Sequence, residues 1–372
     1  MLRALIIAIA VITFTVVSAN RVWAHPAWGI VVDRNNQIYF SDLETVWRID
    51  AQGKLTVFRA GVSGRHTHDL NLGEDGNLYG VDNGYEPATQ RFSAALWKLT
   101  PAGEFSYVVA PTYDPPKAMT IWKDRAGNSF YVGQSENAQR DIFVLKRTPD
   151  GIVTTVAGNR KAGDAYRQVA LYSVGGMAVG SDGTLYFTDN SNVRKVTPDG
   201  QMKMLASNLA LENPAESATP ESRVTRLFGI TVDGQGNAFV ADYGNRRVLK
   251  ITSGGIVSTV SSAEKPWAPT GVTLKDGNLY LLEFGFTPPG TYTPRVRRLS
   301  PDGKIVILGT VGDAEKSAPQ ASADETVETN AVPARRSPYI LIGAVLGILA
   351  LGVVAWLAGK RVLAHQRQGN LP

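Results

Sequence analysis

One turn motif recurs six times along the 372 residues, and it constrains the fold more than any other feature of the sequence. Each copy has a basic residue and a turn closed by glycine, with an apolar residue after the basic one in five of the six copies, as in the segment 195–200 (KVTPDG). The closing glycines are spaced by 48 to 55 residues: Gly53, Gly103, Gly151, Gly200, Gly255 and Gly303. A regular period of this length is typical of repeat proteins and propellers.

The earlier half of each unit has the pattern of a β-hairpin. An aromatic residue stands near the start of the second expected strand in all six units: Tyr39, Tyr79, Phe130, Tyr186, Phe239 and Tyr280. A turn rich in Asp, Asn or Gly precedes each aromatic residue, as in tight hairpin connections. Over residues 227–260, four short apolar or alternating runs are separated by such turns, so each unit is predicted to form four antiparallel strands.

A single four-stranded sheet cannot bury both of its faces, and the repeats supply the neighbours that it needs. Six sheets arranged around an axis cover one another's faces and leave only short edges. The predicted fold is all-β: a six-bladed β-propeller of four-stranded antiparallel blades over residues 25–310. The first unit begins with an inner strand near Trp28 and the sixth ends with an outer strand near Leu308, so each blade should consist of consecutive residues.

The two ends of the chain have the pattern of membrane targeting. Residues 1–24 combine Arg3, an apolar run and small residues before a cleavage point after Ala19 or Ala24. This pattern is typical of a signal peptide, with an uncleaved anchor as the alternative. Residues 338–359 carry no charge and are long enough to span about 30 Å of hydrocarbon, which predicts a transmembrane helix.

The segments beside this helix complete the predicted topology. Residues 311–337 are rich in Ala, Ser, Glu and Thr and are predicted to be a flexible linker. Residues 360–372 are predicted to be a short cytoplasmic tail. The sequence thus predicts a single-pass membrane protein, attached through one C-terminal helix, whose propeller is exported to the periplasm or the extracellular space.

The net charge of +5 does not indicate a nucleic-acid partner. Six of the 38 basic residues flank the two apolar segments, which leaves 32 basic against 33 acidic residues elsewhere: Arg3, Arg335, Arg336, Lys360, Arg361 and Arg367. A nucleic-acid binder should instead carry its basic excess on a folded face. The chain has no cysteine, which excludes disulfides and thiol catalysis.

The repeat units resemble NHL repeats, most closely at residues 228–260 and 174–200. Residues 155–159 (TVAGN), followed by Gly163-Asp164, are similar to the loop that joins blades in that family. The resemblance covers all six units, more loosely in the second, third and sixth. It implies a six-bladed propeller related to the gluconolactonase/senescence-marker group and to the peptidyl-hydroxyglycine lyases, but a shared fold alone does not imply an activity.

Carboxylates are predicted to ring one end of the channel of this propeller. In each blade, the start of the innermost strand and the end of the second strand should lie at the same end of the sheet. The predicted second strands end in Asp42, Asp82, Asp189, Asp242 and Glu283. Turn chemistry favours a structural role for Asp42, Asp189 and Asp242. Asp82 and Glu283 precede longer loops and are equally compatible with a role in the channel mouth, which is the usual ligand site.

The longer loops are expected to rise from the same face as these carboxylates. Residues 83–95 and 285–295 connect second to third strands and contain several aromatic residues. Long loops crowded on one face of a rigid scaffold commonly bind ligands, although exposed aromatic residues could simply cap the blades. The predicted ligand-binding residues are Asp82, Asn83, Tyr85, Tyr243, Glu283 and Tyr292.

The segment His66-Thr67-His68-Asp69 is the least repetitive start of an inner strand. Histidines two positions apart on a strand point to one side, which suits paired metal ligation. The predicted metal ligands are His66, His68, Asp69, Asp82 and Glu283, with Zn²⁺ or Mn²⁺ for mixed ligation and Ca²⁺ for carboxylates alone. In the alternative, His68 bonds a neighbouring blade and His66 is solvated.

Two functions remain open from the sequence. The first is a membrane-anchored extracytoplasmic propeller that binds a protein, peptide or glycan at its loop-rich channel mouth without catalysis. The second is a metal-dependent hydrolase, similar to the lactonases, or a lyase. The lactonase resemblance implies a metal-binding glutamate at the start of the first inner strand, where this chain has Ala27-Trp28-Gly29. The lyase resemblance implies several channel histidines, of which this chain has few, and no catalytic residue is predicted.

We predict that residues 25–309 fold alone as a soluble monomer, because all six units are complete within them and the linker is polar. Size-exclusion chromatography and a cooperative thermal transition would test this. Insoluble expression of that segment, with a full-length chain that folds in detergent, would contradict it.

Overall fold

The computed structural model describes residues 26–87, 89–116, 119–134, 141–158, 170–209, 227–287 and 291–312. The chain divides into two compact units, Met1–Ala318 and Pro319–Pro372, and every described residue belongs to the first. The predicted signal peptide, most of the linker, the transmembrane segment and the tail lie outside the described residues. Within the described part of the chain, no helix is long and apolar enough to cross a membrane.

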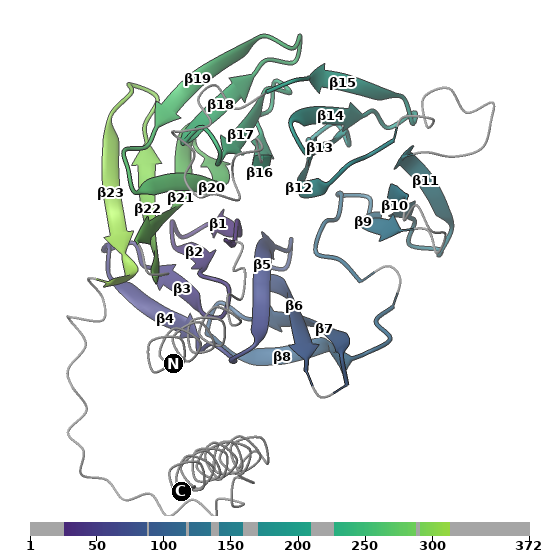
Figure 1. The fold of residues 1–372 in the computed structure, drawn as a ribbon, viewed down its shortest axis with the longest axis horizontal. Helices are drawn as coiled ribbons and strands as arrows, with labels where there is room; N and C mark the ends of the chain where they lie inside the picture. Colours follow the sequence, from purple (N-terminus) through teal and green to yellow (C-terminus); the bar gives the residue numbers. More distant parts are fainter. Residues whose placement is uncertain are drawn as a thin grey trace, which may run out of the picture. The chain divides into compact units, whose positions relative to one another are not determined.

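Six antiparallel sheets surround a common axis and form a six-bladed β-propeller (Figure 1). Each sheet consists of consecutive strands, as the sequence predicts. Blades 1 to 3 contain β1 (Ile30–Val32), β2 (Ile38–Ser41), β3 (Val46–Ile49), β4 (Leu55–Arg59); β5 (Arg65–Leu72), β6 (Leu78–Glu86), β7 (Arg91–Leu99), β8 (Phe105–Thr112); and β9 (Ser129–Gln134), β10 (Ile142–Arg147), β11 (Val153–Gly158). Blades 4 to 6 contain β12 (Val174–Val179), β13 (Leu185–Asp189), β14 (Asn192–Val196), β15 (Met202–Ala206); β16 (Leu227–Val232), β17 (Ala238–Asp242), β18 (Arg247–Ile251), β19 (Val257–Ser262); and β20 (Trp267–Lys275), β21 (Asn278–Thr287), β22 (Thr291–Leu299), β23 (Ile305–Thr310).

The recurring glycines close the turn between the third and fourth strands of each blade. All six have a positive φ between 84° and 94°: Gly53, Gly103, Gly151, Gly200, Gly255 and Gly303. Glycine adopts this left-handed conformation without the steric cost that a Cβ atom brings. The turn geometry therefore explains the most regular mark in the sequence.

Aspartates organise the tight turns between the first and second strands. In blade 5, the Asp233 carboxylate accepts hydrogen bonds from the backbone N–H groups of Gln235 and Asn237, both at 2.9 Å. In blade 1, Asp33 accepts corresponding bonds from Asn35 and Gln37. These side chains satisfy turn donors that the strands leave unpaired.

Apolar clusters between adjacent blades form the core. Buried residues of blades 6 and 1 make one such cluster, which includes Phe40, Trp47 and Leu282, and thereby closes the ring. Further clusters join blades 1 and 2, 3 and 4, 4 and 5, and 5 and 6. The Lys275 ammonium of blade 6 also donates to Asn36 of blade 1 at 2.8 Å. Closure thus rests on packing between the first and last blades.

Blade 3 departs from the predicted four strands. Over its described residues the sheet has three strands, and the segment 119–123 takes the place of the innermost strand without forming a regular one. The segment is still held to β9, because the Trp122 carbonyl accepts from Phe130 N at 2.9 Å and Thr120 Oγ1 donates to Phe130 O at 2.7 Å. Polar contacts, including Asn71 Nδ2 to Ile121 O, join this segment to blade 2.

The innermost strands approach so closely that glycine is required at four positions. A Cβ atom on Gly29 would lie 2.7 Å from Leu70 N, and one on Gly176 would lie 2.7 Å from Phe228 O. Gly229 and Gly271 meet the backbone of the following inner strand in the same way. The width of the channel at this level is therefore set by backbone contacts between blades.

We predict that Gly176→Ala destabilises the propeller by about 1–3 kcal/mol, because its methyl group would press on the rigid backbone of the next blade. Gly234→Ala is the matched control, since nothing lies within 4 Å of the added Cβ atom. Urea unfolding of the purified full-length proteins measures both effects. Equal midpoints for the two variants would show that the inner strands are not in close contact.

Candidate functional site

The ends of the second strands lie beside the starts of the first strands, as the sequence predicts. Thr67 pairs with Asp82, Val174 with Asp189, and Leu227 with Asp242. Pro269 pairs with Glu283 in blade 6. These carboxylates therefore belong to one end of the ring, which we call the channel mouth.

The carboxylate of Asp82 is buried and fully engaged by its neighbours. Arg59, which ends the outer strand of blade 1, binds it with two nitrogens, at 3.0 Å and 2.5 Å. Trp97 Nε1 donates to it at 2.8 Å, and Thr67 Oγ1 donates at 2.5 Å. Arg59 also stacks over the Trp97 ring at 4.7 Å. Asp82 thus ties blade 1 to blade 2, and burial keeps its carboxylate away from a ligand in solvent.

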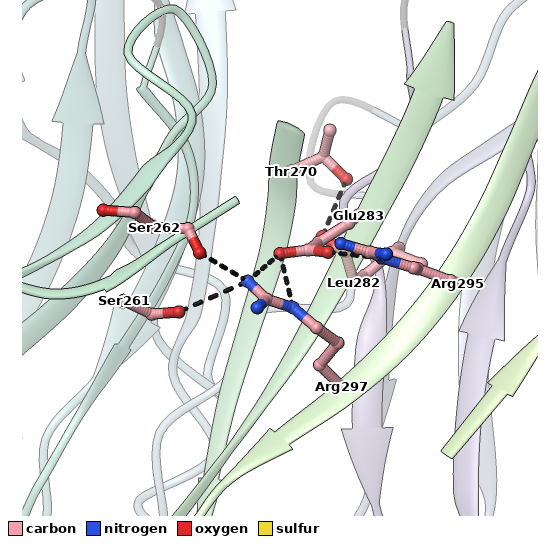
Figure 2. A network of polar contacts seen from close by, with 7 residues as sticks. All are labelled: Ser261, Ser262, Thr270, Leu282, Glu283, Arg295 and Arg297. Atoms are coloured by element: carbon pink, nitrogen blue, oxygen red, sulfur yellow. Dashed lines mark hydrogen bonds and ion pairs between the residues drawn. The ribbon is translucent and has the colours of Figure 1, made fainter. Parts of the chain in front are cut away.

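Glu283 is held in the same way by two arginines of β22 (Figure 2). Arg295 Nε donates to one carboxylate oxygen at 2.7 Å, and Arg297 Nε donates to the other at 2.9 Å. Arg297 also donates to Ser261 Oγ and to the Ser262 carbonyl of blade 5, as Figure 2 shows. The side chain of Glu283 is completely buried, so this network ties blade 5 to blade 6.

The remaining three carboxylates also accept hydrogen bonds from nearby donors. Asp189 accepts from Tyr172 N at 2.7 Å and from Arg194 Nε at 2.8 Å. Asp242 accepts from Asn245 and from Arg247 Nε at 2.9 Å. These hydrogen bonds agree with the structural role predicted for Asp189 and Asp242. In a turn the donors follow the aspartate, whereas the backbone donor to Asp189, Tyr172, precedes it in the chain.

Asp42 differs because its side-chain partner is neutral. It accepts from Thr45 N at 2.7 Å and from Trp47 Nε1 at 2.6 Å. Burial raises the pKa of Asp42, and these hydrogen bonds oppose the rise. Burial likewise raises the pKa of Asp242, against the effects of Asn245 and Arg247.

The predicted metal ligands are only partly brought together. Asp82 and Glu283 are occupied by arginines, as described above, while His66, His68 and Asp69 share the start of β5. Among the described residues, no group of three or more His, Asp or Glu side chains is placed to hold an ion. The residues of the described channel mouth therefore do not fit the predicted metal site.

A row of stacked rings crosses the channel mouth. Trp28 of blade 1 stacks on His68 of blade 2 at 5.3 Å and on Phe228 of blade 5 at 5.7 Å, measured between ring centroids. His66 and Tyr243 extend the row at its two ends through edge contacts. Tyr243 is therefore buried within the mouth, whereas the sequence predicts a ligand contact there.

Asp69 is the carboxylate that faces this row without a cationic partner. Asp69 Oδ1 accepts from Leu70 N at 2.8 Å, and Oδ2 accepts from Trp122 Nε1 of blade 3 at 3.0 Å. The ion pairs between described residues do not include Asp69. Burial raises its pKa to about 6, although these hydrogen bonds and the Trp28 indole favour the charged form.

Asp69 is partly exposed to solvent, yet its carboxyl group is desolvated enough for burial to raise its pKa. A narrow channel explains both, because solvent can touch part of the residue while protein atoms surround it on most sides. Likewise, the Trp28 Nε1 atom is buried and makes no hydrogen bond of ordinary geometry, so its effect on Asp69 is the weakest of those that favour the charged form.

The other predicted binding residues lie on long hairpins. Tyr85 faces Phe92 in the β6–β7 ladder, with ring centroids 4.9 Å apart, and Asn83 is exposed beside them. Tyr292 faces Phe286 in the corresponding β21–β22 ladder of blade 6, and its side chain is outside the described part of the structure. The binding prediction for these residues stays a prediction.

A shallow pocket of about 290 Å³ lies away from the mouth. It is lined by residues of blades 4 and 5, including the turn residues Asp182, Asp233 and Ser253 and the strand residue Lys195. These turns join first to second and third to fourth strands, so they stand at the end of the sheets opposite the carboxylates. We do not assign the site to this pocket, because its aspartates are already bonded within their own turns.

The sequence could have separated Asp69 from the other metal candidates. In blades 1, 2, 4, 5 and 6, one inner-strand residue pairs with the position that follows the recurring aromatic residue. The residue before it is Gly29, Gly176, Gly229 or Gly271 in four blades and Asp69 in blade 2. A carboxylate at a position that is glycine in four other blades is the signal. The stacking partners Trp28 and Phe228 had no such signal, because ring contacts across the channel depend on the closed fold.

Comparisons with known proteins give remote likenesses only. No family model matches the chain, and neither does any curated protein. Among solved structures, a virginiamycin B lyase from Staphylococcus aureus is 17% identical, with 76% of this chain and 83% of that chain covered and a TM-score of 0.41. A gluconolactonase from Xanthomonas campestris is 14% identical, with 69% and 83% covered and a TM-score of 0.44. A putative gluconolactonase is 15% identical, with 69% and 85% covered and a TM-score of 0.46. We base the propeller assignment on the sheets themselves.

We predict that Asp69→Asn changes stability in a pH-dependent way. A raised pKa means that the folded chain holds the Asp69 proton more tightly, so this contribution to stability is complete below the ordinary pKa of 3.8 and is lost as pH rises through about 6. Asparagine does not ionise. The stability of the variant relative to the parent should therefore rise by about 2 kcal/mol between about pH 4 and about pH 7.5.

Urea unfolding of both full-length proteins at the two pH values measures this difference. A difference between parent and variant that does not change with pH would show that Asp69 is well solvated, contrary to the structure.

Proposed function

We propose that this chain is a membrane-anchored, extracytoplasmic β-propeller that binds a protein, peptide or glycan ligand at its channel mouth. The proposal has two parts, binding and anchoring. The patterns of residues 1–24 and 338–359 support the anchoring. The described residues of blade 2 support the binding.

The observation that carries the binding proposal is an aromatic pair held in solvent. Phe92 is 70% exposed and Tyr85 is 48% exposed, although the two rings are in contact with each other. Nearby, the Arg91 guanidinium lies 4.7 Å from the exposed ring of Tyr113. Covering apolar rings with a ligand surface is favourable because it removes them from water.

The hairpin that carries this pair is a rigid extension of its blade. β6 and β7 have nine residues each, whereas the second strands of blades 1, 4 and 5 have four or five. Its backbone ladder continues without interruption to the pair of Glu86 with Arg91. Blade 6 has a comparable extension in β21 and β22, and the two long hairpins stand on either side of blade 1. Rigid presentation lowers the entropy lost on binding.

The alternative of a metal-dependent hydrolase or lyase has less support. It needs carboxylates or histidines free to converge on an ion, at about 2.0–2.6 Å. Asp82 and Glu283, two of the predicted ligands, accept hydrogen bonds from arginines instead. Metal analysis of the purified protein distinguishes the two functions, since a stoichiometric ion that survives dialysis would favour the enzyme.

We predict that Tyr85→Ala combined with Phe92→Ala weakens ligand binding by about 30-fold or more, the effect of removing an aromatic hot spot. Folding should be nearly unaffected, because both side chains are largely exposed. Peptide and glycan arrays probed with the full-length protein in detergent identify ligands, and titration of those ligands measures the loss.

Ile256→Ala is the matched control for this experiment, since Ile256 is 71% exposed but belongs to the outer turn of blade 5. It should leave binding unchanged. Equal binding by the parent and the double variant, or an equal loss in the control, would contradict the assignment to the blade 2 hairpin.

A further inference from the structure

The channel is asymmetric at the level where the inner strands come closest. Blades 1, 4, 5 and 6 have glycine there, and each glycine is pressed against the backbone of a neighbouring strand. Blade 2 has Asp69 at the corresponding place, one residue before Leu70. Between blades 2 and 3, contacts of the described residues are polar rather than an apolar cluster. Among the described residues, room for a side chain at this level is thus confined to the sector of blades 2 and 3. The charged side chain there is that of Asp69.

Asp69 differs from four of the five strand-end carboxylates in how its charge is balanced. Asp42, the fifth, also has neutral donors only, but it accepts three hydrogen bonds. Asp82, Asp189, Asp242 and Glu283 each bind at least one arginine. Asp69 is held by two neutral N–H groups, one on each oxygen, from Leu70 and Trp122. Each carboxylate oxygen can accept a second hydrogen bond. A desolvated carboxylate without a cation is costly for the folded chain, and a cation from outside would remove that cost.

The surroundings of Asp69 are suited to an organic cation. The Trp122 indole binds its carboxylate directly, and Trp28 stacks on His68, the residue before Asp69. Carboxylates combined with aromatic rings are typical of sites for ammonium and guanidinium groups. Trp28, His68 and Asp69 are all partly exposed, so solvent reaches this part of the mouth.

We propose that Asp69 receives the cationic side chain of a peptide ligand, a lysine ammonium or an arginine guanidinium, while the Tyr85–Phe92 pair contacts the rest of the peptide. This inference rests on the binding function proposed above and narrows its ligand to a basic peptide. Lysine and arginine side chains carry the cation that this carboxylate lacks, whereas an unmodified sugar ring carries no charge. A glycan ligand is therefore disfavoured.

Three blocked tripeptides test this inference on the full-length protein in detergent: Gly-Lys-Gly, Gly-Arg-Gly and Gly-norleucine-Gly. Norleucine matches lysine in its aliphatic chain but carries no charge. Isothermal calorimetry should show that at least one cationic tripeptide binds about tenfold or more tightly than the norleucine one, the effect of a charge-assisted hydrogen bond. Asp69→Asn should abolish this preference.

Asp302→Asn is the matched control, because Asp302 is an exposed turn aspartate that bonds Lys304 N at the other end of blade 6. It should retain the preference in full. The unfolding midpoint of Asp69→Asn at neutral pH shows whether this variant is folded. Loss of the preference in a folded variant that is as stable as the parent, or more stable, indicates a binding role, since a residue with only a structural role would lower stability when replaced.

Other outcomes would overturn the inference. These are equal binding of all three tripeptides, no binding of either cationic tripeptide, and an unchanged preference in Asp69→Asn. If array ligands, whether peptides or glycans, still depend on Tyr85 and Phe92, the binding function stands and only the role of Asp69 is wrong. If neither the tripeptides nor any array ligand binds, both proposals are wrong.

Discussion

The close approach of the inner strands around the axis determines much of what this propeller can do. Where two backbones are in contact, a side chain cannot be accommodated, and this explains the glycine at 29, 176, 229 and 271. Apolar side chains are directed instead between the blades, where they form the clusters that close the ring. Only blades 2 and 3 carry larger residues at this level, Asp69 and Thr120. The chemistry of the channel is therefore set by a few side chains in one sector.

The carboxylates of the mouth illustrate how position alone misleads about function. Asp82 and Glu283 are buried and bound by arginines that also contact a neighbouring blade. A buried ion pair contributes little net stability compared with apolar packing, but removing one partner costs about 3–5 kcal/mol, because the other charge is left uncompensated. These pairs thus fix how adjacent blades are joined, and their carboxylates are buried away from solvent. Asp69 is different because no part of the described chain supplies its cation.

The repeat pattern predicted the fold well, for a physical reason. Tight turns need residues that tolerate positive φ, and all six glycines at the end of the recurring motif have that conformation. Contacts between blades were harder to predict. Arg59 lies 23 residues before Asp82 and on another sheet, so nothing local indicates that they pair. The same holds for the ring contacts of Trp28, and for the irregular inner segment of blade 3, where Thr120 and Trp122 stand in place of a strand pattern.

Asp69 connects the stability of the fold to binding. Its ionised form is disfavoured by about 3 kcal/mol relative to a solvated carboxylate, on the basis of a pKa raised to about 6. A ligand cation that restores the solvation of this charge could recover part of that free energy, and a recovery of 1.4 kcal/mol already corresponds to a tenfold gain in affinity. Asp82 and Glu283 have no such reserve, because arginines compensate their charges before any ligand arrives. Among the carboxylates of the described mouth, Asp69 thus costs the ligand-free chain the most free energy. For the same reason, a cationic ligand gains the most binding free energy by pairing with Asp69.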